Sequence, residues 1–319
     1  MGAVCAGALV STQACDLCAI NSATTARAEA TGFVFTLGSQ YISAGNLQLN
    51  SQSLPGNNPE FLDTSVIHFI PGFNFTRDLG VSLNIPLVRK DFQYFSKRFG
   101  TSPSGRSEGL GDLSLIGRWT PWSYQTMTKV FRINALAGAK FPTGDTAYLK
   151  QDLDDEKFYD LVYGPGHNHL FSGVHPHDLT LGSGSVDGVF GLTTYARWQR
   201  LYATTEAQYY LRTAGEGDFR FGDTVMVAGG PGVYAIIQGP FTLSLQGLVR
   251  FENTEHSSYG SKPAGQTGMR EIYAGPQIGI TVGSHFSGQA GADLPIDIRN
   301  RGLQTVPDFR VHASVTWSF

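Results

Sequence analysis

The chain has 319 residues, of which 41% are hydrophobic and 15% are charged, and its formal net charge at pH 7 is −3. This balance has neither the basic excess of a nucleic-acid-binding protein nor a polyacidic tail, so we expect no nucleic-acid partner. No run approaches the roughly 18 consecutive apolar residues of a membrane-spanning helix. If the chain spans a bilayer, it must therefore do so as a closed β-sheet, which satisfies every backbone group without water.

The first 14 residues resemble a signal peptide that lacks the usual basic start. Residues 2–10 are small and apolar, and small residues stand at −3 and −1 of a cleavage site after Ala14. A buried first strand is the alternative interpretation. Cleavage would leave a periplasmic segment, 15–32, that opens on Cys15 and Cys18. Their Cys-x-x-Cys spacing favours a small disulfide in an oxidising compartment, with a redox or metal contact to a periplasmic partner as the alternative.

Twelve strand-like segments follow, each with apolar and β-branched residues between turn residues. We expect strands at 33–42, 62–75, 81–92, 111–120, 129–140, 186–199, 201–213, 223–236, 241–252, 270–282, 287–295 and 307–319. An even number of strands is typical of a bacterial outer-membrane barrel.

The connections between these segments alternate between short and long. The short ones are 76–80, 121–128, 199–200, 238–240 and 283–285, and the long ones are 43–61, 93–110, 141–185, 215–222, 253–269 and 296–305. Bacterial barrels have tight periplasmic turns, long external loops and both termini inside. The sequence therefore predicts an all-β fold over 33–319: a transmembrane antiparallel β-barrel of about twelve strands, of outer-membrane type. A soluble β-sandwich is the alternative.

Alternation along the strands separates a lipid face from a polar interior. In segment 241–252 the apolar Leu245, Val249 and Phe251 share one side, whereas Arg250 and Glu252 share the other. The same rule predicts these charged lumen-lining residues: Lys90, Arg118, Arg132, Lys140, Arg197, Arg212, Arg250 and Arg310, with Asp112, Asp187, Glu206, Glu252, Glu271 and Asp293. Such charges either line a water path or pair and close it, and both alternatives stay open. Segments 62–75 and 223–236 alternate too poorly to assign.

Three short motifs lie in the middle of the chain. They are Gly111-Asp112-Leu113-Ser114-Leu115-Ile116-Gly117-Arg118-Trp119, Gly138-Ala139-Lys140-Phe141-Pro142-Thr143-Gly144-Asp145 and Leu181-Gly182-Ser183-Gly184-Ser185-Val186-Asp187. On these motifs, residues 30–319 resemble the outer-membrane proteins grouped as transporters of the meta-pathway of phenol degradation. The resemblance implies a barrel that passes small hydrophobic or aromatic compounds. The motifs also have a structural interpretation, because Pro142 fixes φ and Gly144 permits a tight turn.

The longest predicted external loop, 141–185, contains two His-x-His pairs. They are His167 with His169 and His175 with His177. Imidazole is a good ligand for borderline divalent metals, so a copper or zinc ion is the one cofactor that the sequence suggests. A solvated polar loop without metal is the alternative.

The last nine residues alternate between apolar and polar side chains and end on Phe319. This pattern predicts a closing strand with Val315, Trp317 and Phe319 against outer-membrane lipid and His312 in the lumen. It also predicts that Phe319 is the signal through which the barrel-assembly machinery engages the chain.

The chain has no nucleophile elbow, phosphate-binding loop or His-Glu-x-x-His motif, so we do not expect an enzyme. The sequence predicts a channel in the outer membrane of a Gram-negative bacterium, for passive uptake or export of small molecules. The alternative is a surface metal-binding receptor or scaffold barrel that presents the His-rich loop and the periplasmic Cys-x-x-Cys.

Overall fold

The computed structural model describes residues 31–55, 59–95, 100–163 and 172–319. The predicted signal peptide, Cys15, Cys18, His167 and His169 lie outside the described residues. Neither α-helix in the described part has the length and apolarity that a membrane-spanning helix requires.

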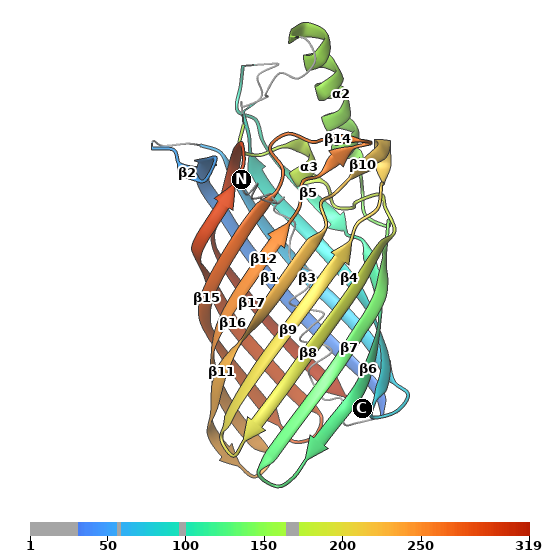
Figure 1. The fold of residues 1–319 in the computed structure, drawn as a ribbon, viewed down its shortest axis with the longest axis vertical. Coiled ribbons are helices and arrows are strands. Elements are labelled where there is room, and N and C mark those ends of the chain that lie inside the picture. Colours follow the sequence, from blue (N-terminus) through green and yellow to red (C-terminus); the bar gives the residue numbers. More distant parts are fainter. Residues whose placement is uncertain (1–30, 56–58, 96–99, 164–171) are drawn as a thin grey trace, which may run out of the picture.

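Twelve long antiparallel strands form a closed barrel (Figure 1). They are β1 (Gly32–Leu49), β3 (Phe61–Asn74), β4 (Leu79–Gln93), β6 (Leu113–Gln125), β7 (Lys129–Phe141), β8 (Asp187–Trp198), β9 (Leu201–Leu211), β11 (Thr224–Gln238), β12 (Phe241–Thr254), β15 (Met269–Val282), β16 (Phe286–Asn300) and β17 (Leu303–Ser318). Each pairs with the next along the chain, and β17 closes the barrel by pairing with β1. The predicted fold class, a twelve-stranded outer-membrane barrel, is confirmed.

Some predicted strand ends are wrong, mostly at the long-loop end of the barrel; at the short-turn end, β6 continues to Gln125 instead of ending near residue 120. We expected β1 to stop near residue 42 and the last strand to begin near residue 307, but β1 continues to Leu49 and β17 begins at Leu303. Polar residues such as Gln48 and Gln304 suggested loops. They instead lie opposite each other in a β-ladder, because backbone pairing between β1 and β17 continues beyond the alternating part of the sequence.

The two ends of the barrel differ in structure (Figure 1). One end has short turns and the C-terminus. The other carries β2 (Gln52–Ser53), β5 (Ser104–Leu110), α2 (Ala147–Tyr163), α3 (Pro176–Leu179), the 3₁₀ helix η1 (Glu216–Asp218), β10 (Phe219–Arg220), β13 (Ser258–Tyr259) and β14 (Lys262–Pro263). Strands β10, β13 and β14 form a small separate sheet. The predicted long connections are therefore at this end, and they contain short helices and strands that the sequence analysis did not assign.

The outer surface of the barrel is apolar and its interior is polar. Large exposed aromatic side chains gather near the short-turn end, including Phe33, Phe75, Trp119, Trp122, Trp198 and Phe319. Such a band is typical of the membrane interface of outer-membrane barrels. In β3, whose faces the sequence left unassigned, Val66, His68 and Ile70 are buried inside while Ile67 is exposed. The alternation failed because this strand carries apolar side chains on both faces.

Candidate functional site

A row of buried charged side chains follows the inner wall from β9 to β17. Arg250 of β12 lies 3.1 Å from Asp293 of β16, measured from Nε to Oδ2, and 3.9 Å from Glu206 of β9, measured from Nη1 to Oε1. These side chains are almost fully buried. The charges therefore pair with one another along the wall, which is how buried ions are tolerated in a protein interior.

Arg310 of β17 continues this row of charges. Its Nη1 donates to Glu252 Oε1 at 2.8 Å, and its Nη2 donates to Glu271 Oε1 at 3.2 Å. The guanidinium also lies 4.1 Å from the ring centroid of Tyr273, which is a cation–π distance. Tyr273 donates its hydroxyl to Glu271 and so fixes the carboxylate that receives Arg310. We name the residues Glu206, Arg250, Glu252, Glu271, Asp293 and Arg310 the charge row.

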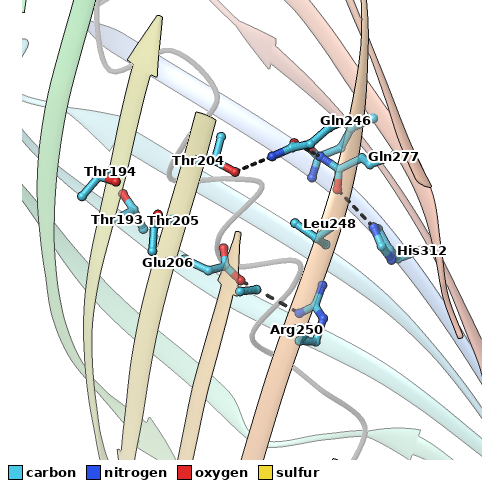
Figure 2. Close-up of a pocket in the computed structure, with 12 residues that line it drawn as sticks. Thr193, Thr194, Thr204, Thr205, Glu206, Gln246, Leu248, Arg250, Gln277 and His312 are labelled. Atoms are coloured by element: carbon cyan, nitrogen blue, oxygen red, sulfur yellow. Dashed lines mark hydrogen bonds and ion pairs between the residues drawn. The ribbon is translucent and has the colours of Figure 1, made fainter. Parts of the chain in front are cut away.

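A cavity lies beside the charge row inside the barrel (Figure 2). Its lining is mostly able to form hydrogen bonds: Thr193, Thr194, Thr204, Thr205, Glu206, Gln246, Arg250, Gln277, Gln289 and His312, with Ala228 and Leu248 as the apolar members. Gln246 Nε2 donates to Thr204 Oγ1 at 2.7 Å, and His312 Nε2 lies 3.4 Å from Gln277 Oε1. The cavity has a volume of about 80 Å³, which is enough to hold water.

Three tyrosines gather where the inner wall approaches the short turns. Tyr195 and Tyr234 share a hydrogen bond of 2.8 Å between their hydroxyls, and the Tyr202 ring centroid lies 5.1 Å from that of Tyr234. A Cβ on Gly232 would lie 2.3 Å from the Tyr202 ring, so glycine leaves the room in which this ring rests against the wall. The tyrosines place aromatic faces next to the polar cavity.

The three sequence motifs converge at one carboxylate, that of Asp112. Its Oδ1 accepts a hydrogen bond from the backbone N–H of Gly144 at 3.0 Å, and its Oδ2 accepts both the backbone N–H and the hydroxyl of Ser183. Lys140 Nζ lies 2.8 Å from the same Oδ2 and 3.5 Å from Asp187. We name Asp112, Lys140, Gly144, Ser183 and Asp187 the Asp112 junction.

Close packing and a further ion pair complete this region. A Cβ on Gly144 would lie 2.7 Å from the backbone of Gly182, so the two motif segments touch through backbone atoms. Arg212, the residue after β9, donates to Asp187 at 2.9 Å. The structural interpretation of the motifs thus has a concrete basis, since they fix the segment between β7 and β8 to the inner wall. Sequence reasoning did not detect this convergence, because alternation within one strand does not identify the residue opposite it in the neighbouring strand, as Asp187 is opposite Lys140.

Other predicted lumen residues have separate surroundings. Arg118 donates to Thr120 at 2.8 Å and to Asn74 at 3.0 Å, and it is buried. Arg132 and Arg197 are partly buried on β7 and β8. Lys90 donates to the backbone carbonyls of Asp178 and Thr180, both at 2.7 Å. Lys90 therefore holds the segment that contains α3 against β4.

The segment around α3 also contains His175 and His177, stacked with ring centroids 5.1 Å apart. Pro176 starts the short helix α3 here, so the second His-x-His pair does not lie in an extended segment. His177 Nδ1 lies 2.9 Å from Asp152 Oδ2 of α2. Burial lowers the pKa of His177, but the carboxylates of Asp178 and Asp152 outweigh this effect and raise it to about 9. Burial opposes ionisation of Asp178, yet mainly His177 lowers its pKa to about 2.

No family model and no curated protein matches the chain. Among solved structures, the fold is similar to a crystal structure of an outer membrane channel from Pseudomonas putida F1, with a TM-score of 0.63 and 11% identity over 91% of this chain and 96% of that chain. The β-domain of the Bordetella autotransporter Brka gives a TM-score of 0.46 and 10% identity over 91% of this chain and all of that one. At these identities the first similarity establishes the fold alone, and the second adds no argument.

Proposed function

We propose that this barrel is a passive channel for small molecules in the outer membrane of a Gram-negative bacterium. The long-loop end faces the outside, and the short turns and C-terminus face the periplasm, as in other bacterial barrels. The observation that carries the proposal is the hydrogen-bonding cavity within a closed barrel. A wall of threonine, glutamine and paired charges offers replacement partners to a solute that loses its water on entry.

We further propose that the solutes combine an aromatic ring with polar groups. The tyrosine group of Tyr195, Tyr202 and Tyr234 offers ring faces, and the adjoining cavity offers donors and acceptors. Aromatic pairs gain roughly 0.5–1.5 kcal/mol beyond their buried area. This class agrees with the aromatic compounds that the resemblance to the phenol-degradation transporters implies. A purely apolar solute would instead leave the polar wall unsatisfied.

The channel itself can be tested with purified, folded protein in planar lipid bilayers. Folding is verified first by the shift in gel mobility between unheated and heated samples. We expect discrete conductance steps. A silent bilayer with folded protein would contradict the channel and support the receptor or scaffold alternative.

The substrate class requires a flux measurement in liposomes. A hydroxybenzoate, whose charge prevents free diffusion through lipid, should enter faster than an aliphatic hydroxy acid of similar mass. Tyr202→Leu should reduce this preference, whereas Tyr124→Leu, on an exposed side chain of β6, should preserve it. Equal entry of the two acids through the wild type would contradict the aromatic class while leaving the channel intact.

A further inference from the structure

The side chains of His175, His177 and Asp178 face one another at the long-loop end. One potential ligand atom from each of the three lies within 4.8 Å of the others. His175 Nδ1 lies 3.4 Å from Asp178 Oδ2, and His177 Nε2 lies 3.7 Å from Asp178 Oδ1. Ligand atoms around a tetrahedral ion, with bonds of about 2.0–2.2 Å, stand roughly 3.3–3.6 Å apart. The two nitrogen–oxygen separations, each to a different oxygen of Asp178, are close to this range.

The nitrogens that face away from Asp178 are held by other groups. His177 Nδ1 lies 2.9 Å from Asp152 Oδ2, and His175 Nε2 lies 3.2 Å from Gln266 Oε1. Both acceptors are oxygens, so each ring can keep its proton on the outer nitrogen, and an ion that binds the inner nitrogen of His177 would displace the proton there. A metal-binding histidine is commonly oriented in this way by a carboxylate or carbonyl behind it.

The inner nitrogen of His175 points to the same conclusion. Nδ1 is buried and makes no hydrogen bond within the described residues, although Asp178 is close. A buried polar atom without a hydrogen bond costs free energy unless an ion or water completes its surroundings. The orientation of both rings and this incomplete atom are separate observations, and both favour a ligand between the rings and Asp178.

We propose that His175, His177 and Asp178 bind one divalent transition-metal ion of the zinc or copper class. Asp152 and Gln266 orient the two imidazoles, and the fourth coordination position stays open. Two imidazoles and one carboxylate suit these borderline ions, whereas calcium and magnesium prefer oxygen ligands alone. This site goes beyond channel activity and does not depend on it.

A bound ion would strengthen the contacts that hold α2, α3 and the small sheet at the long-loop end. His177 already connects α3 with Asp152 of α2, and Tyr259 of β13 donates to the same Asp152 carboxylate. Lys90 connects the carbonyl of Asp178 to the barrel wall. These contacts already join α2, α3 and the small sheet to the barrel, and an ion at Asp178 would reinforce them.

Calorimetric titration of zinc and copper into the full-length folded protein, after removal of metal with a chelator, tests the site. We expect one equivalent to bind at neutral pH. His175→Ala, His177→Ala and Asp178→Asn should each weaken binding at least 100-fold, and Asp152→Asn should weaken it 10- to 100-fold because it only orients a ligand. Cobalt bound to the wild type should give a visible spectrum of tetrahedral type, and His177→Ala should remove that spectrum.

Two controls locate the binding on the chain. His256→Ala changes another histidine at the same end of the barrel and should preserve binding, as should the double variant His167→Ala with His169→Ala. Gel mobility verifies that each variant folds. Unchanged binding in the His175→Ala and His177→Ala variants would overturn the proposal. So would wild-type protein that binds no ion, or loss of binding in the His167 and His169 double variant alone.

Discussion

The barrel contains two buried groups of charges that are held in different ways. At the Asp112 junction, the carboxylate accepts hydrogen bonds from the backbone N–H groups of Gly144 and Ser183. In the charge row, the contacts that join Arg250 to Glu206 and Asp293 run between side chains. A carboxylate that binds backbone fixes the path of a chain segment, whereas paired side chains can change rotamer and partner. The junction therefore fixes the path of the segment between β7 and β8, and for the proposed channel we expect the row to be the part that responds to a solute.

The largest effect should come from Asp112→Ala. The substitution removes the acceptor for Gly144 and Ser183 and leaves Lys140 buried with Asp187 as its more distant partner. Breaking a buried ion pair from one side costs about 3–5 kcal/mol. The segment between β7 and β8 should then become more sensitive to proteases added from outside, while heated and unheated samples still show a barrel. Wild-type protease resistance would contradict the structural role of the junction.

A second test addresses the assumption that the charge row faces inward. Val315 and His312 lie on opposite faces of β17, and His312 lines the cavity. Val315→Asp places a charge against lipid at a cost of up to about 2–4 kcal/mol and should deplete folded protein in the membrane. His312→Ala should have a mild effect on folding. The reverse order of yields, measured by gel mobility of membrane fractions, would mean that the faces are exchanged.

A smaller effect is expected at the contact between the motif segments. In Gly144→Ala the new methyl would lie 2.7 Å from backbone atoms of Gly182 and Leu181, which cannot move as a side chain could. Such overpacking costs roughly 1–3 kcal/mol. Urea titration of the folded barrel in detergent or lipid should detect the loss, if folding is reversible there. An unchanged midpoint would mean that the segments do not touch as described.

The matched control is Gly247→Ala. A Cβ at Gly247 meets nothing within 4 Å, and the residue is exposed on β12. Its urea midpoint should stay close to that of the wild type, because surface substitutions away from special features usually change stability by no more than about 0.5 kcal/mol. A large loss here would show that glycine to alanine is harmful in these strands generally, and the Gly144 result would then say nothing specific about the junction.

The sequence predicted the barrel well because apolar and polar residues alternate within most strands, so each of these strands indicates which residues face lipid and which face the lumen. Val249 and Arg250 stand next to each other in the chain, and the structure places the first outside and the second inside. Alternation does not identify the faces of β3, where Val66 and Ile70 are apolar although they face inward. It also fails at the long-loop end, where Gln48 and Gln304 are polar but belong to strands.

The candidate site was harder to predict, because its parts meet only in three dimensions. Alternation suggested which charges face inward, but not that Arg250 pairs with Glu206 and Asp293. The His-x-His spacing did identify His175 and His177 as candidate metal ligands. It gave no sign of Asp152 or Gln266, which approach from α2 and from a loop far along the chain.

The central claim is that the charge row borders the conducting path and can respond to what passes. The most direct test is the reversal potential across a planar bilayer with a potassium chloride gradient, measured for the wild type, Arg250→Gln and Glu206→Gln. Loss of the cation at Arg250 should shift the selectivity towards potassium, and loss of the carboxyl at Glu206 should shift it towards chloride. Opposite shifts are the predicted result. Conducting variants whose reversal potentials all equal that of the wild type would contradict the account.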